Sequence, residues 1–431
     1  MPVHREGKEL MRLPADPLRL RPFPSNRYPA AENAAVAAIS GSWAPTTGTL
    51  PVAGFWAEPN DTAVMSADGA ILLAGGEDGR RNPLALSARF DPASSTWTAT
   101  ARQLNTARRL HTLTRLADGK VLVAGGITGP VTVPARGTNT AEIFDPANGG
   151  GWTTVASMNE PRFSHSATLL ADGSVLVAGG CSARSGDSNR ALRSTEIYNP
   201  AANTWTVAEP MNDIRLGHPA IRLANNKILV VGGVITIGRG QYAALGYCEM
   251  YDPKTGPDTG TWSTTASLAA PRKGHQATLL KDGSVLVTGG DIPTSSYSST
   301  IQPYSQETCE RFQLNGDGVG GWRADTAMPW GLSQHRAVLL PTSGKVLVIG
   351  GTDSGVFDTG YTDTILYTPG ANGAAGTWAI SATMTVGRWA AAVAALPGDK
   401  VLVAGGVVRS GPAAPTLGED LLTTTAEVYT P

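Results

Sequence analysis

The sequence predicts an all-β fold, a seven-bladed β-propeller with four antiparallel strands in each blade. Glycine and proline are abundant, at 51 and 30 of 431 residues, which favours short strands and turns over helices. Glycine pairs that close an apolar strand recur at a period near 50 residues, which is typical of propeller blades. These pairs begin at Gly75, Gly125, Gly179, Gly232, Gly289, Gly350 and Gly405.

Each repeat contains the same elements in the same order. A turn such as Asp172-Gly173 precedes the apolar strand 175–178, and a variable loop follows the glycine pair. The sequence VLVA is too apolar for a half-exposed strand and fits one covered on both faces by neighbouring blades. The third strand ends in Phe90, Phe144, Tyr198, Tyr251, Phe312, Tyr367 or Tyr429. The fourth strand contains Trp97, Trp152, Trp205, Trp262, Trp322 or Trp378.

The seventh tryptophan is found near the other end of the chain. Only six tryptophans follow the glycine pairs in this register, and Trp43 supplies the missing one. We therefore expect residues 41–51 to complete the blade formed by residues 388–431, which leaves no open blade edge. The propeller is expected to span 41–431, and residues 1–40 to form a proline-rich N-terminal arm.

These ordered motifs resemble the kelch family of β-propellers over about residues 41–431. The glycine pair, the Tyr or Phe and the Trp match that family in sequence order. The resemblance implies the fold. Kelch propellers include enzymes, lectin-like binders and adaptors, so it does not imply one function.

Charge and composition exclude several classes of function. The chain has 34 Lys and Arg against 35 Asp and Glu, without a strongly basic stretch, so we expect no nucleic-acid partner. No segment is long and apolar enough to suggest a membrane span, and the first residues lack the apolar core of a secretory signal. We therefore expect a cytoplasmic protein. No phosphate-binding glycine loop is present, so no nucleotide cofactor is expected, and the three cysteines are expected to be free thiols.

Five of the six histidines occupy one position of the repeat, at the start of the first strand. They are His111, His165, His218, His275 and His335, while Asp61 and Ala391 fill this position in blades 1 and 7. Three residues earlier stands an arginine in five blades, namely Arg108, Arg162, Arg215, Arg272 and Arg388.

Two interpretations of these rings are open. In the structural one, the histidines hydrogen-bond the neighbouring blade and the arginines pair with carbonyls or carboxylates, and the count follows from the repeat. In the functional one, several imidazoles hold one Cu, Zn or Fe ion or transfer protons, and the arginines bind an anion. Asp61 and Trp389 are further ligand-binding candidates.

The kelch resemblance bears on both interpretations. Galactose-oxidase-like copper enzymes have a ligand histidine at this register, directly after a ligand tyrosine. Here the preceding residues are Leu110, Ser164, Gly217, Gly274 and Gln334, which disfavours a radical-copper oxidase. In kelch adaptors, arginines at this register bind acidic peptides.

Two functions are open from the sequence, and the sequence favours the first. One is an enzyme that acts on a small polar or anionic molecule at the mouth of the central channel, assisted by a metal on the histidines. The other is a non-catalytic module that binds an acidic peptide or a partner protein. The long, variable loops after the glycine pairs place either site on that face.

Overall fold

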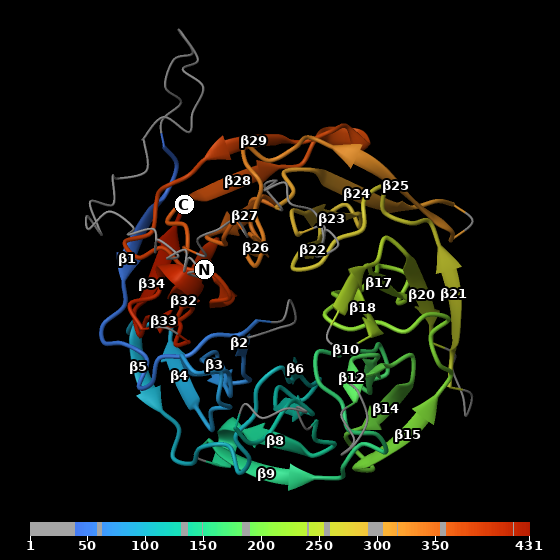
Figure 1. Ribbon diagram of the computed structural model, residues 1–431, viewed down its shortest axis with the longest axis horizontal. Coiled ribbons are helices and arrows are strands. Elements are labelled where there is room, and N and C mark those ends of the chain that lie inside the picture. The colour runs from blue at the N-terminus through green and yellow to red at the C-terminus, as the bar shows by residue number, and fades with distance from the viewer. Residues whose placement is uncertain are drawn as a thin grey trace, which may run out of the picture. The chain divides into compact units, whose positions relative to one another are not determined.

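Seven four-stranded antiparallel sheets surround a central axis in the computed structural model (Figure 1). The chain divides into two units, Met1–Ile39 and Ser40–Pro431, and the second is the propeller. The structure describes residues 39–57, 63–130, 137–148, 150–182, 190–238, 241–253, 259–291, 305–316, 318–353, 359–416 and 418–431. Residues 1–38 of the predicted arm lie outside these ranges.

Within each blade the strands run from the axis outward. Blade 1 contains β2 (Ala63–Met65), β3 (Ile71–Ala74), β4 (Ser87–Asp91) and β5 (Thr96–Ala99). Blade 2 contains β6 (Thr112–Arg115), β7 (Val121–Ala124), β8 (Ala141–Asp145) and β9 (Gly151–Val155). Blade 3 contains β10 (Ser166–Leu169), β11 (Val175–Ala178), β14 (Thr195–Asn199) and β15 (Thr204–Ala208). Blade 4 contains β16 (Ala220–Arg222), β17 (Ile228–Val231), β20 (Cys248–Asp252) and β21 (Thr261–Thr265).

The remaining blades follow the same order. Blade 5 contains β22 (Gln276–Leu279), β23 (Val285–Thr288), β24 (Cys309–Leu314) and β25 (Gly320–Asp325). Blade 6 contains β26 (Arg336–Leu339), β27 (Val346–Ile349), β28 (Thr364–Thr368) and β29 (Thr377–Ile380). Blade 7 contains β30 (Ala392–Leu396), β31 (Lys400–Ala404), β34 (Ala426–Thr430) and β1 (Ser42–Pro45).

Three two-stranded ribbons lie in the loops that follow the glycine pairs. They are β12 (Cys181–Ser182) with β13 (Arg190–Ala191), β18 (Val234–Gly238) with β19 (Gln241–Ala244), and β32 (Val407–Arg409) with β33 (Leu421–Leu422). Short 3₁₀ turns occur at Pro146–Asn148, Ala371–Gly373 and Gly411–Ala413. We call the side of the propeller that carries these loops the loop face. Among the described residues, no helix is long and apolar enough to cross a bilayer.

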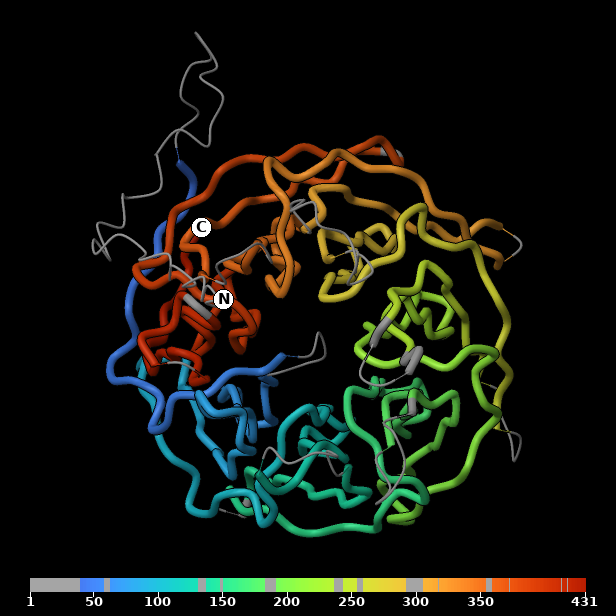
Figure 2. Tube along the Cα trace, in the orientation of Figure 1, coloured from blue at the N-terminus to red at the C-terminus, as the bar shows by residue number. Residues whose placement is uncertain are grey.

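The first and last strands of the propeller close the ring, as predicted. Strand β1 pairs with β34 in antiparallel register, and Trp43 lies opposite Tyr429. Figure 2 shows the two ends of the colour scale meeting in this blade. The closure gives all seven blades an outer strand, and the predicted seven-bladed propeller is confirmed.

The core lies between the blades. The second strand of each blade is buried along its length, as in β7 and β11, because blades cover both of its faces. In every blade the aromatic residue of the third strand lies opposite the tryptophan of the fourth. The two ring centroids are between 4.9 Å apart in the Tyr198–Trp205 pair and 5.4 Å apart in the Trp43–Tyr429 pair. These pairs explain why the two aromatic positions recur together.

Candidate functional site

The segment before each inner strand makes a tight corner near the axis. The residue directly before each of the five histidines has a positive φ, which is 54° at Leu110, 53° at Ser164 and 53° at Gln334. Such a backbone is uncommon for residues other than glycine. It is held by bonds between blades, because the N–H of Ser164 donates to the Leu110 carbonyl at 2.9 Å and the N–H of Gly217 donates to the Ser164 carbonyl at 2.8 Å. This corner directs the arginine and the histidine on its two sides to different places.

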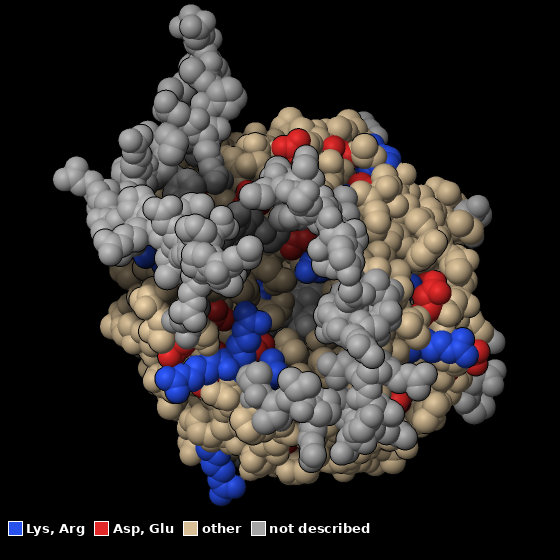
Figure 3. Space-filling view, viewed as in Figure 1, with Lys and Arg blue, Asp and Glu red and all other residues tan. Residues whose placement is uncertain are grey.

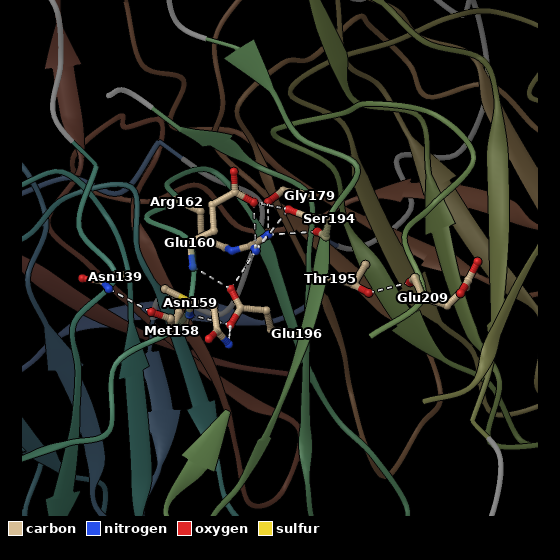
Figure 4. Close-up of polar contacts among 10 residues, drawn as sticks. All are labelled: Asn139, Met158, Asn159, Glu160, Arg162, Gly179, Ser194, Thr195, Glu196 and Glu209. Atoms are coloured by element: carbon tan, nitrogen blue, oxygen red, sulfur yellow. Dashed lines mark hydrogen bonds and ion pairs between the residues drawn. The ribbon is translucent and has the colours of Figure 1, made fainter. Parts of the chain in front are cut away.

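The repeated arginine points into its own blade, as Figure 4 shows for Arg162. Its Nη1 donates to the carbonyls of Gly179 and Ser194, both at 2.9 Å, and its Nη2 donates to Glu196 Oε1 at 3.0 Å. Arg162 is fully buried. Burial lowers the pKa of Arg162, and the charge of Glu196 acts in the opposite direction.

The glutamate of this pair also holds the linker from the preceding blade (Figure 4). Glu196 accepts the backbone N–H groups of Asn159 at 2.7 Å and Glu160 at 3.1 Å. A buried carboxylate with three charge-assisted or backbone donors is well satisfied. The same pairs occur as Arg108–Glu142, Arg215–Glu249, Arg272–Glu310 and Arg388–Glu427.

The arginine and the glutamate are present or absent together. Blade 6 has Leu332 at the arginine position, and Ile365 stands where the other blades have the glutamate. Blade 1 has Ala88 at the glutamate position. Because each member occurs only with its partner, the ring of arginines is a set of pairs inside blades. Anion binding by these arginines stays a prediction, and the geometry favours the structural interpretation.

The repeated histidine contacts the blade before its own. His165 Nε2 lies 3.1 Å from Thr112 Oγ1, His218 Nε2 lies 3.0 Å from Ser166 Oγ, and His335 Nε2 lies 2.8 Å from Thr288 Oγ1. His111 Nε2 donates to the Ala74 carbonyl at 3.1 Å. The five histidines therefore lie in five successive blade interfaces and do not converge.

Glycine pairs make room for these histidines. The first glycine of blade 2, Gly125, faces the His165 ring, whose Cε1 would lie 2.7 Å from an added Cβ. The second glycine of blade 3, Gly180, faces the other side of His165, whose Cβ would lie 2.8 Å from an added Cβ. A side chain at either glycine would overlap the histidine. This contact explains why the glycine pair and the histidine recur together.

His275 differs from the other four, because neither of its ring nitrogens makes a hydrogen bond of good geometry in the described structure, although the Val231 and Arg272 backbones interact with the ring. In the preceding blade, Pro219 occupies the position at which Thr112 and Ser166 offer a hydroxyl to the next histidine. Proline has no such group. The imidazole is nevertheless fully buried.

Burial keeps these imidazoles neutral. It lowers the pKa of His111, His275 and His335 to about 3, with a further lowering by the nearby arginines Arg108, Arg272 and, for His335, Arg336. Burial also holds the pKa of His165 and His218 well below the ordinary value. A group of three or more His, Cys, Asp or Glu side chains able to hold a metal is not found in the described parts of the chain. The predicted Cu, Zn or Fe site thus stays a prediction.

Blade 1 departs from the spacing of the others. Asp61, the predicted counterpart of the histidines, lies outside the described residues. In blade 6 the N–H of the second glycine, Gly351, donates to the carbonyl of Arg388 in blade 7. In blade 7 the N–H of the second glycine, Gly406, donates to the carbonyl of Gly54 at 2.9 Å, so Gly54 takes the place of the arginine in blade 1. Trp56 packs beside both Gly76 and Gly405, within 3.2 Å of an added Cβ in each case. Trp56 therefore fills the place between blades 7 and 1 that histidines fill in the five interfaces between blades 1 and 6.

A third ring lies directly above the arginines on the loop face. We call it the rim ring and define it as the residues that directly follow the arginine position, or Gly54 in blade 1, and form an antiparallel bridge with the residue after a glycine pair. Its residue type varies between blades, with phenylalanine in two of them, and it consists of Phe55, Arg109, Phe163, Leu216, Lys273, Ser333 and Trp389. Of these, only Trp389 is predicted above. A useful signal in the sequence is this variability next to a position that is arginine in five blades, since repeats vary where specificity is set.

Trp389 is half-buried and stacks edge-on against Phe55, with ring centroids 6.1 Å apart. Its Nε1 is buried without a partner in the described structure. Arg109, on the adjacent blade, donates to Glu77 Oε2 at 2.9 Å. The rim ring thus combines aromatic, apolar and charged groups.

The axis contains a cavity of about 400 Å³. It is lined by the inner strands, mainly by small apolar side chains, and the five arginines and five histidines are not among its described lining residues. The cysteines offer no nucleophile near neutral pH, because burial raises the pKa of Cys181 and Cys309 to about 12 and that of Cys248 to about 11.

Comparison with known proteins agrees with this geometry. A Kelch motif family model matches residues 162–212, which is one repeat from its arginine to the following linker. Kelch-like protein 15 of Danio rerio is 27% identical over 264 residues, which cover 55% of this chain and 39% of that protein. Kelch-like protein terF of Aspergillus terreus is 27% identical over 187 residues, which cover 42% of this chain and 38% of that protein. The matches thus span about two fifths of these relatives.

Two solved structures share the fold. A fungal alcohol oxidase of the AA5 family, in complex with copper, has a TM-score of 0.66 and 18% identity, covering 91% of this chain and 76% of its own. The structure of YjhT has a TM-score of 0.56 and 16% identity, and the match covers 77% of this chain and 99% of the YjhT chain. At these identities the likeness establishes the propeller fold alone.

Proposed function

Because this chain is a kelch-repeat β-propeller, we propose that it is a non-catalytic binding module for a protein segment rich in acidic side chains. The segment would bind on the loop face, across the rim ring. One observation carries the proposal. The repeated arginines and histidines are enclosed in and between the blades, whereas three members of the variable rim ring, Arg109, Lys273 and Trp389, keep exposed surface on the loop face; the other four are buried.

The charge on this face supports an acidic partner. Lys and Arg side chains gather over blade 1, beside the central opening (Figure 3). Arg80 and Arg81 lie in the loop after β3, with side chains 71% and 56% exposed. They pair with Glu419 and Asp420 of blade 7 at 3.2 Å and 3.3 Å. The Arg80–Glu419 pair is exposed on both sides and such pairs are weak, so a partner's carboxylate can replace Glu419 there.

The enzymatic alternative has less support from the described residues. A neutral imidazole buried between blades cannot exchange a proton with a substrate near pH 7. The cysteine thiols are buried and protonated. Catalysis on a small molecule, like a cytoplasmic location, stays a prediction from the sequence.

Peptide selection tests the proposal. A random peptide library is selected on the purified chain, and the affinities of the selected peptides are measured for two charge-reversed variants. Arg80→Glu/Arg81→Glu changes the loop face. Lys120→Glu/Lys227→Glu makes the same change of charge in the hairpin turns at the opposite ends of blades 2 and 4.

We expect acidic peptides, and a loss of affinity of about tenfold or more in the loop-face variant alone. Equal losses in both variants would show attraction by net charge only. Selection of peptides without acidic residues would also overturn the proposal.

A further inference from the structure

The inner strands surround the axis (Figure 1), and residues near their ends form a ring on the side of the propeller opposite the loop face. We call it the end ring and define it as the inner-strand residues that pair with the first buried residue of each second strand. It consists of Met65, Arg115, Leu169, Arg222, Leu279, Leu339 and Ala395. Met65, Leu339 and Ala395 line the axial cavity, so the cavity reaches this ring.

The cavity wall next to the end ring is apolar. Ala167, Ala277 and Ala337 line the cavity two positions before the end-ring residues of their strands. Side chains two positions apart point to the same side of a strand, so these alanines continue the surface of the ring. The polar lining residues Gln276 and Arg336 stand at the other end, where β22 and β26 begin. A volume of about 400 Å³ lies in the range of sites for small molecules.

The end ring also contains two exposed arginines, on the two sides of blade 3. Arg222 of blade 4 donates from Nη1 to the Leu169 carbonyl at 3.2 Å, so its side chain reaches the end of β10. Arg115 stands at the end of β6 in blade 2, on the other side of β10. Neither guanidinium forms an ion pair with a carboxylate in the described structure.

The aspartates of the adjacent turns bind other groups. Asp118 pairs with Lys120 at 3.4 Å. Asp172 accepts the hydroxyl of Ser174 at 2.6 Å and the backbone N–H of the same residue at 2.9 Å. Two unpaired cations therefore stand beside an apolar cavity.

From this arrangement we propose that the end ring and the axial cavity bind a phosphate monoester with a single hydrocarbon chain. The phosphate would lie between Arg115 and Arg222, over Leu169, and the chain would extend along the alanine-lined wall. A guanidinium has five N–H donors, and the several oxygens of a phosphate can accept from two arginines at once. The inference does not rest on the acidic partner proposed for the loop face, because it concerns the opposite side of the propeller.

Three probes test the proposal on the full chain. Octyl phosphate, 1-octanol and inorganic phosphate are titrated by calorimetry, below the concentration at which octyl phosphate forms micelles. We expect octyl phosphate to bind with one-to-one stoichiometry and the other two to bind at least about tenfold more weakly, since each keeps only one part of the ligand. Equal affinity for octanol or for inorganic phosphate, or no binding of octyl phosphate, would overturn the proposal.

A matched pair of variants tests the two arginines. Arg115→Gln/Arg222→Gln removes both charges of the end ring, and Lys120→Gln/Lys227→Gln removes two charges from the same two hairpins outside the ring. All four side chains have exposed surface, so we expect both variants to fold, which thermal unfolding checks. The arginine variant should lose about tenfold or more of its affinity for octyl phosphate, and the lysine variant should keep it. Equal losses would show attraction by net charge only and would overturn the assignment.

A second pair of variants tests the place of the chain. Ala277→Leu fills part of the cavity, and Ala201→Leu adds the same bulk in an exposed turn. We expect Ala277→Leu alone to weaken the binding of octyl phosphate about tenfold. Unchanged binding in folded Ala277→Leu contradicts the assignment, and if that variant does not fold, the arginine pair decides.

Discussion

The guanidinium of Arg215 donates to the carboxylate of Glu249 at 2.7 Å, and neither side chain has exposed surface. Glu249 also accepts the backbone N–H groups of Asn212 and Asp213 in the linker from blade 3. One buried pair thereby fixes both the loop of its own blade and the path of the chain into it. This role accounts for the repetition of arginine in five blades.

Removing one member of this pair is expected to be more harmful than removing both. Glu249→Ile leaves Arg215 as an uncompensated buried charge, and we expect a loss of about 3–5 kcal/mol of unfolding free energy. Arg215→Leu/Glu249→Ile copies the Leu332 and Ile365 of blade 6, so the double variant should be more stable than Glu249→Ile. Urea unfolding of the two singles and the double gives the coupling energy, and strictly additive losses would refute the pairing.

In blades 2 to 6, contact with the histidine, rather than backbone conformation, is expected to require glycine at the second position of the pair. Gly180 and Gly129 have nearly equal φ, 93° and 91°, but only Gly180 has neighbours within 4 Å of an added Cβ. Both alanine variants carry the same backbone strain, about 1–2 kcal/mol. Gly180→Ala should lose several kcal/mol more, because its methyl group meets His165 and the Phe163 carbonyl. Similar unfolding midpoints for the two variants would contradict this contact.

His275, whose imidazole makes no hydrogen bond of good geometry in the described structure, should gain one from a hydroxyl in the preceding blade. Pro219→Ser places one where Ser166 serves His218, and we expect a gain of about 1 kcal/mol, the usual worth of a buried hydrogen bond. Ser166→Ala, the converse change, should lose a similar amount. Both are measured by chemical unfolding at pH 7.5. A Pro219→Ser protein that also carries His275→Leu should show no gain, and a gain in that background would contradict the mechanism.

Stability is expected to fall on acidification well above the range where carboxylates titrate. The buried histidines have pKa values of about 3 in the folded state, as for His111 and His335, against about 6.5 when unfolded. The unfolded chain therefore binds more protons below about pH 6.5, and the histidine contribution, complete above that pH, is lost progressively toward pH 3. Each imidazole contributes a slope of up to about 1.4 kcal/mol per pH unit. Urea unfolding between pH 7.5 and 5 measures this slope, and His335→Gln should reduce it, whereas a flat profile would contradict the neutral state.

The fold was predictable because each repeated residue reports a contact that recurs in every blade. The Tyr or Phe and the Trp are cross-strand partners, and the displaced Trp43 faces Tyr429. The apolar pattern of the strands and the spacing of these residues were enough for the assignments, because the same packing between strands recurs in all seven blades.

The direction of the ring side chains was not predictable from spacing. A positive φ at Leu110 or Ser164 turns the chain between the arginine and the histidine. Neither leucine nor serine is a residue type from which a positive φ would be predicted. The glutamates were overlooked, although they occur in the same five blades as the arginines. In blade 1 counting from the glycine pair pointed to Asp61, whereas Gly54 and Trp56 make the contacts with blade 7.

The central claim is that the histidine ring joins blades and binds neither protons nor metal near neutral pH. Long-range ¹H–¹⁵N correlation spectra of the imidazoles, recorded between pH 7.5 and 5 and with one equivalent of Cu²⁺ or Zn²⁺, test it most directly. The account predicts that His111, His165, His218, His275 and His335 stay neutral throughout and keep their shifts when metal is added. Titration of any of the five near pH 6.5, or broadening or displacement of three of them by one equivalent of metal, would contradict it.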